Sequence, residues 1–65
     1  MASKNYTVTG MTCEHCVAAV SEEVGRIAGV TGVEVELDGG ALTVDGEFTD
    51  AQIAEAVDEA GYALA

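Results

Sequence analysis

Proline and tryptophan are absent from this sequence, and only Tyr6, Phe48 and Tyr62 are aromatic. No proline-rich or low-complexity stretch marks a linker, so one domain spanning residues 1–65 is expected. Because aromatic side chains are scarce, the core must consist mainly of valine, isoleucine, leucine and alanine. A chain of 65 residues buries only roughly 60% of its unfolded surface, so its stability is expected to be modest.

Basic side chains are also scarce. The sequence has Lys4 and Arg26 but 12 aspartate and glutamate residues, which gives a net charge of −10. This balance argues against binding to nucleic acid or to anionic membrane surfaces. It fits a protein that meets a basic patch on a partner. An acidic surface that serves only solubility, or life in a high-salt cell, is the competing interpretation.

Long hydrophobic runs are missing. No segment approaches the ~18 apolar residues of a membrane span, and residues 1–10 lack the apolar stretch of a signal peptide. No direct membrane insertion is expected, and the cytoplasm is the expected location. In that reducing compartment, a lone pair of cysteines is typically metal-binding or redox-active rather than a structural bridge.

Alternation of apolar and polar residues predicts strands with one buried face at residues 5–9, 33–37 and 42–45, and a short last strand with Tyr62 and Leu64. Asp38-Gly39-Gly40 reads as a hairpin turn, because glycine tolerates the positive φ that such turns require.

Two segments follow the period of a helix instead. The first has an apolar face and Gly29 as its expected end; the second begins with the capping box Thr49–Gln52 and ends at Gly61. The apolar positions of the two faces are Val17, Val20, Val24 and Ile27, and Ile53, Ala56, Val57 and Ala60. The order strand, helix, strand, strand, helix, strand predicts an α+β ferredoxin-like βαββαβ sandwich, with four antiparallel strands and both helices on one face.

Gly10-Met11-Thr12-Cys13-Glu14-His15-Cys16 contains both cysteines of the chain, at the junction between the first strand and the first helix. Partial positive charge at a helix N-terminus lowers the pKa of a thiol there, and the thiolate is the form that binds metal. Cys16 is therefore expected to titrate below its ordinary value. Thiolates are soft ligands that favour Cu(I), and two of them cannot complete the four-ligand shell of structural zinc. A Cys13–Cys16 disulfide and a small dithiol redox protein are the alternatives.

This motif resembles the Gly-Met-Thr-Cys-x-x-Cys signature of heavy-metal-associated domains. Ile27-Ala28-Gly29-Val30 followed by Val33-Glu34-Val35 is similar to the family's helix-to-strand junction, and Glu59-Ala60-Gly61-Tyr62 to its closing helix end. Members are free-standing copper chaperones or modules of copper-transporting P-type ATPases, and the free-standing bacterial chaperone is the nearer match. The resemblance implies Cu(I) bound by Cys13 and Cys16, transfer to a partner Cys-x-x-Cys site on such an ATPase, and no enzymatic activity. A carrier of another soft metal such as zinc, or a storage protein, is the remaining alternative.

Four further residues around the cysteines have expected roles. In the family, the residue at Met11 packs beneath the loop, although its thioether is able to bind copper. Thr12 stands where zinc-type members carry aspartate and offers no carboxylate. His15 is either a solvated side chain that tunes Cys16 or an auxiliary ligand across a copper-bridged homodimer. Tyr62 is either a core aromatic or a shield for the metal loop.

Overall fold

The computed structural model describes residues 2–65, so Met1 of the predicted 1–65 domain lies outside it. Strands and helices follow in the predicted order, with a short helical turn η1 between the second and third strands. Their bounds are β1 Ala2–Thr9, α1 Glu14–Gly25, β2 Val30–Val35, η1 Asp38–Gly40, β3 Ala41–Gly46, α2 Asp50–Glu59 and β4 Ala63–Leu64. No helix among residues 2–65 is long and apolar enough to cross a membrane.

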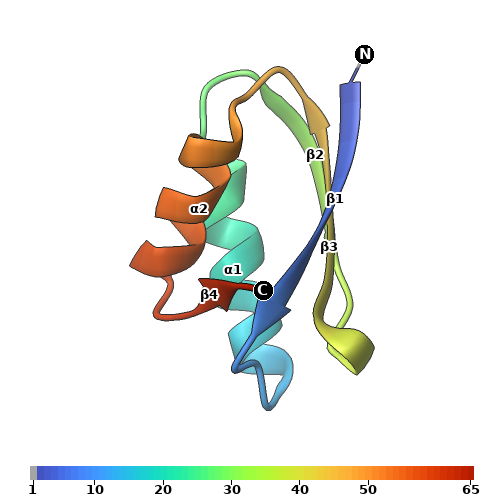
Figure 1. Ribbon diagram of the computed structural model, residues 1–65, viewed down its shortest axis with the longest axis vertical. Helices are drawn as coiled ribbons and strands as arrows, with labels where there is room; N and C mark the ends of the chain where they lie inside the picture. The colour runs from blue at the N-terminus through green and yellow to red at the C-terminus, as the bar shows by residue number, and fades with distance from the viewer. Residues whose placement is uncertain (1) are drawn as a thin grey trace.

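The four strands form one antiparallel sheet in the order β2-β3-β1-β4. Both helices cover the same face of this sheet, and the loop between β1 and α1 lies at one end of the molecule, beside the turn η1 (Figure 1). The ferredoxin-like α+β fold predicted from the sequence is therefore confirmed. The loop that carries Cys13 is therefore a connection between two packed elements rather than a free segment.

The core lies between the sheet and the helices and contains aliphatic side chains only. Its members are Val8, Val20, Val24, Leu42, Val44, Ile53, Ala56 and Val57. The inward positions predicted for the third strand and for both helices are buried as expected, apart from Val17, Ile27 and Ala60, which are half-buried. Cys16 is also buried, but none of the eight aliphatic members of this core is a candidate metal ligand.

The first helix is shorter than predicted. It ends at Gly25 with Arg26 as its C-cap, and the Ile27 N–H bonds to the Val24 carbonyl, which tightens the last turn. Glycine has low helix propensity, so the chain leaves the helix there rather than at Gly29. Gly29 instead has a φ of 97° in the turn to β2, where a Cβ would collide with the Glu47 carbonyl.

The second strand lies earlier in the chain than the range 33–37 that the alternation predicts. It covers Val30–Val35, so Leu37 is outside it and is 39% exposed. Leu37 has helical backbone angles that begin the turn, which removes it from the alternation of the strand. Three further elements differ in their bounds: β1 begins earlier than residue 5, β3 extends one residue beyond each end of the predicted range 42–45, and Tyr62 precedes β4 rather than belonging to it.

The second helix begins as predicted. The Thr49 side chain accepts a hydrogen bond from the Gln52 N–H, and the Gln52 side chain accepts one from the Thr49 N–H. Asp50 then ties this helix to β1, because its carboxylate accepts hydrogen bonds from the Tyr6 hydroxyl at 2.7 Å and from the Lys4 ammonium at 3.0 Å. Burial and the Asp50 carboxylate raise the pKa of Tyr6 to about 12.

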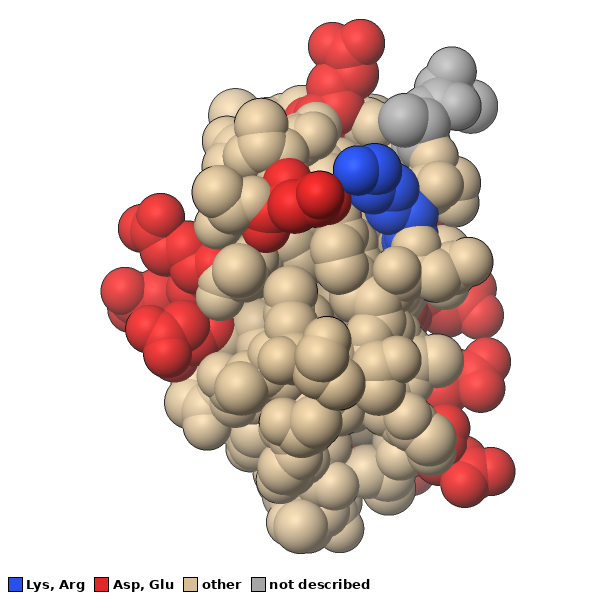
Figure 2. All heavy atoms as spheres, in the orientation of Figure 1, with Lys and Arg blue, Asp and Glu red and all other residues tan. Residues whose placement is uncertain are grey.

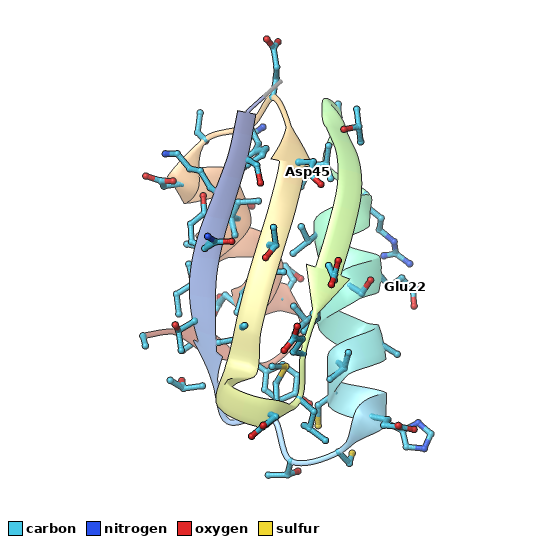
Figure 3. All side chains as sticks on the ribbon, turned by 90° about the vertical axis from the view of Figure 1, so that its right-hand side faces the viewer. Glu22 and Asp45 are labelled. Carbon is cyan, nitrogen blue, oxygen red and sulfur yellow. The ribbon has the colours of Figure 1, made fainter. Side chains whose placement is uncertain are left out.

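Acidic side chains project from both flanks of the molecule, while the lower end of the view in Figure 2 is free of charge. Glu22 projects from α1, and Asp45 lies on the sheet face that the helices leave open (Figure 3). Glu22 and Glu23 pair with Arg26, at 2.9 and 3.3 Å, and Asp50 pairs with Lys4. Both basic residues are thus engaged within the chain, and most of the acidic side chains have no cationic neighbour among residues 2–65.

Candidate metal centre

The loop Gly10–Cys13 leads from the end of β1 to the start of α1. Gly10 has a φ of 90°, a conformation that glycine adopts without strain. Cys13 is the N-cap of the helix, with extended backbone angles, and its carbonyl accepts hydrogen bonds from the N–H groups of Cys16 (3.0 Å) and Val17 (3.4 Å). This geometry places Cys16 in the first turn and directs both thiols to the same end of α1.

The two sulfur atoms lie 3.6 Å apart, and both cysteines are free. Cys13 is exposed, whereas Cys16 is only 9% exposed. The disulfide considered from the sequence is thus not formed here. Zinc–thiolate bonds are about 2.3 Å long, so two bonds of that order reach one ion from sulfur atoms 3.6 Å apart. The pair can therefore hold a single soft metal ion with one ligand open to solvent.

Hydrogen-bond donors surround the Cys16 sulfur. They lower the pKa of Cys16 to about 6, through a backbone hydrogen bond from Thr12, the Tyr62 side chain and a backbone hydrogen bond from Cys13, against a smaller opposing effect of burial. The Thr12 hydroxyl also lies 3.9 Å from this sulfur. The lowered pKa predicted from the sequence is confirmed in direction, but its largest cause is the backbone of Thr12 rather than the helix dipole.

The turn that ends α2 brings Tyr62 to the site. The Gly61 N–H bonds to the Asp58 carbonyl and the Tyr62 N–H bonds to the Val57 carbonyl, with Gly61 at a φ of 92°. This is the hydrogen-bond pattern of a Schellman motif. It turns the chain so that Tyr62 packs against the core near Cys16, and the interaction between the two side chains raises the pKa of Tyr62. Tyr62 therefore packs against the core, as one of the two interpretations has it, and it also lies close to the loop before α1.

Met11 and His15 differ in their surroundings. Met11 is half-buried and packs against the core, as the resemblance implied, whereas His15 is exposed on the first turn of α1. Within residues 2–65 no group of three or more histidine, cysteine, aspartate or glutamate side chains is arranged to hold one ion. The site thus offers two thiols, and His15 does not join them in a single molecule.

The sequence did not reveal two features of the site. One is the backbone of Thr12 as a donor to Cys16, for which a single sequence contains no signal. The other is the contact across the loop, since a Cβ on Gly10 would lie 3.5 Å from the Tyr62 ring. The glycine of Gly61-Tyr62, directly after an apolar helix, was the available signal that Tyr62 is held in a defined turn.

Comparisons with known proteins agree with this arrangement. The model of the heavy-metal-associated domain matches residues 5–63. The copper chaperone CopZ of Bacillus subtilis (strain 168) is 38% identical over 68 residues, covering 100% of this chain and 99% of that protein. A solved CopZ metallochaperone has a TM-score of 0.93 at 30% identity, covering 98% of this chain and 100% of that one. A copper binding domain from HMA7, a P-type ATPase, has a TM-score of 0.94 at 26% identity, covering 100% of this chain and 92% of that one. This chain belongs to the heavy-metal-associated domain family.

Proposed function

We propose that this protein is a copper chaperone that binds Cu(I) between Cys13 and Cys16 and passes it to a partner cysteine pair. The observation that carries the proposal is the pair of free thiols 3.6 Å apart, one exposed and one buried. Similarity over the whole chain to proteins named copper chaperones supports it. Those relatives are named as carriers, which supports transport of metal rather than catalysis.

Cu(I) is proposed over zinc because of the ligand types. Both sulfur ligands are soft and favour Cu(I), whereas structural zinc takes four ligands that one molecule does not bring together within residues 2–65. The hydrogen bonds to Cys16 favour its thiolate form near neutral pH, and the thiolate is the form that ligates metal. One thiolate is thus ready to bind before metal arrives.

Transfer is proposed to proceed by ligand exchange. A partner thiolate adds to the two-coordinate ion beside Cys13, which is exposed, and a resident sulfur then leaves with its proton supplied by solvent. The ion keeps its oxidation state, and each bond that forms replaces one that breaks. The associative order is the same as in thiol–disulfide exchange. A site with few ligands can therefore hold copper tightly and still release it quickly.

The acceptor is proposed to be a metal-binding domain of a copper-transporting P-type ATPase. The likeness of this fold to the HMA7 domain supports it, since two modules of one shape can present matching cysteine loops. A copper-bridged homodimer, with His15 as an added ligand, is the form proposed for the protein in the absence of an acceptor. We place the activity in the cytoplasm, where reducing conditions keep both thiols free.

A small dithiol redox protein is the second candidate, and the lowered pKa of Cys16 beside a second sulfur at 3.6 Å favours it. Such a thiolate is also the attacking group in disulfide exchange. Catalysed reduction of a protein disulfide by the metal-free chain, at a rate well above that of free dithiol, would favour this candidate over the chaperone.

Competition for Cu(I) with a chromogenic chelator tests the proposed function. Cys13→Ser and Cys16→Ser should each lower Cu(I) affinity by several orders of magnitude, because each variant leaves one soft ligand. Ser21→Ala, on the same helix and away from the thiols, is the matched control and should bind as the parent chain does. Retention of the parent affinity by either cysteine variant would show that the two-thiolate site is wrong.

A further inference from the structure

A groove of about 280 Å³ lies between the end of α1 and the outer side of α2. Its lining residues are Ile27, Ala28, Gln52, Glu55, Ala56 and Glu59. Ile27, Ala28 and Ala56 contribute an apolar floor, while Glu55 and Glu59 stand at the rim as exposed carboxylates. None of the residues around the two thiols lines this groove, so the metal site does not account for it.

The rim carboxylates do not serve the stability of α2. Glu55 and Glu59 are four residues apart on one helix, a spacing at which like charges destabilise. Glu59 is the last residue of α2, where a negative charge opposes the helix dipole, and no basic residue in that turn compensates it. Neither forms an ion pair within residues 2–65, because Lys4 and Arg26 are engaged elsewhere. Figure 2 shows acidic side chains gathered on the flank where Figure 1 places α2.

An apolar floor beneath paired carboxylates matches one kind of side chain closely. Arginine packs its methylene stem on apolar surface and keeps its charged group in water. Its planar guanidinium offers several N–H donors and is able to contact two carboxylates. Lysine shares the stem but presents a compact, strongly hydrated charge. Charge complementarity and the apolar floor together therefore favour an arginine.

We propose that this groove docks an arginine side chain of the protein that receives the metal. Glu59 lies three residues before Tyr62, whose ring lies 3.5 Å from the Cβ position of Gly10, so the end of α2 joins the groove to the loop that carries the thiols. Ile27 and Ala28 follow the C-terminal end of α1, whereas Cys13 caps its N-terminus, so a partner docked in the groove must extend along the helices to reach Cys13. The identity of the docked protein as the metal acceptor rests on the proposed function, whereas the preference of the groove for a guanidinium does not.

A peptide titration tests the groove without metal. The probes are acetyl-Ala-Arg-Ala-amide and the same peptide with citrulline, which keeps the shape and removes the charge. In amide NMR spectra of the reduced chain, the arginine peptide should give saturable shifts at Ile27, Ala28 and Ala56, and the citrulline peptide should bind at least several-fold more weakly. Equal binding of the two peptides would overturn the proposal and indicate a groove for neutral groups.

Matched charge variants locate the site. Glu55→Gln with Glu59→Gln should weaken binding of the arginine peptide by about fivefold, because each exposed ion pair changes affinity by a factor of about two to five. Glu34→Gln with Glu36→Gln removes the same charge from exposed positions in and just after β2 and should have little effect. Equal losses for both double variants would show only general attraction to an acidic protein, which contradicts a groove site.

Metal transfer links the groove to the partner. With the metal-binding domain of a copper-transporting ATPase from the same organism, Glu55→Gln with Glu59→Gln should slow Cu(I) transfer several-fold at unchanged Cu(I) affinity, and the β2 control pair should not. If the chain fails to bind Cu(I), the proposed function is wrong while the peptide titration still reports on the groove. If Cu(I) binds and moves at the parent rate in the groove variant, docking of the acceptor through this groove is wrong.

Discussion

Cys13 and Cys16 are identical residues three positions apart, yet their surroundings give them different roles. Cys13 is exposed at the N-cap, where under the proposed function a partner thiolate can reach a bound ion. Cys16 is buried in the first turn, where donors from Thr12 and Tyr62 favour its thiolate. We infer that Cys16 is the more firmly held ligand and that exchange begins at Cys13.

The contribution of Tyr62 can be measured directly. On a Cys13→Ser background, the alkylation rate of Cys16 followed against pH should give a pKa near the value of about 6 expected from its hydrogen bonds. Tyr62→Phe should raise this pKa by about one pH unit, because one hydrogen bond of ordinary strength to the thiolate is lost. An unchanged titration curve in Tyr62→Phe would remove the tyrosine from the set of donors.

The same lowered pKa predicts how the stability of the metal-free chain depends on pH. Cys16 has a lower pKa when folded than its ordinary value of ~8.5 when unfolded, so the unfolded chain binds more protons between the two values. Its contribution to stability is therefore fully present above pH ~8.5 and is lost as the pH falls through about 6. Cys16→Ser should remove this part of the pH dependence of urea unfolding, while Cys13→Ser should retain most of it.

At the level of elements, the turn η1 lies next to the loop Gly10–Cys13, and glycine residues in η1 allow this close packing. Gly39 and Gly40 both have positive φ, at 79° and 70°. Gly39 faces open space, whereas a Cβ on Gly40 would collide with the Val8 carbonyl in β1. Gly40 therefore sets how closely the β2–β3 hairpin approaches the strand that leads into the cysteine loop.

Replacing each of these two glycines with alanine distinguishes the free-energy cost of backbone strain from that of a steric clash. Gly39→Ala should destabilise the fold by about 1–2 kcal/mol, the cost of a left-handed conformation with a Cβ. Gly40→Ala carries the same cost and a steric conflict of about 1–3 kcal/mol more. Urea unfolding of the two variants gives the comparison, and equal destabilisation would contradict the close approach of η1 to β1.

At the scale of the whole molecule, the aliphatic core and the negatively charged surface have opposing effects on the stability of the fold. The eight core residues are buried without help from metal, which stabilises the fold through loss of apolar surface to water. The net charge of −10 opposes compactness through self-repulsion. The metal-free chain should therefore remain folded, with a stability that rises when salt screens the surface.

Thermal unfolding of the reduced, metal-free chain tests this balance. We expect well-dispersed amide NMR signals without metal, in contrast to zinc fingers, which unfold when stripped. We also expect the melting temperature to rise between low and high ionic strength, because exposed charges are screened within about 10 Å at 0.1 M salt. Poor amide dispersion in reducing buffer would show that the core is insufficient by itself.

The same surface should govern encounter with a basic acceptor. Long-range attraction raises the association rate and is weakened by salt, whereas Cu(I) binding as proposed depends on ligands at the thiols rather than on distant surface charge. Stopped-flow transfer to the ATPase domain should therefore slow as ionic strength rises, at nearly constant Cu(I) affinity. A transfer rate that does not depend on salt would leave the acidity with a role in solubility only.

Local signals in the sequence determined the element order, the capping box at Thr49 and the cysteine pair at a helix start. These features depend on neighbours along the chain: alternation, helical period and caps act within a few residues. Such signals are weaker at the ends of elements, because competing turns differ little in local energy. Gly25 rather than Gly29 ends α1, and Leu37 lies outside β2.

Only the tertiary structure decided how the thiols are activated and what surrounds them. Tyr62 is 46 positions from Cys16 in the chain, and the end of α2 brings it to the sulfur through a turn that the sheet and core hold in place. The groove likewise combines Ile27, which follows α1, with Glu55 and Glu59 of α2. Contacts of this kind arise when separate elements pack together, so no periodicity within one element can reveal them.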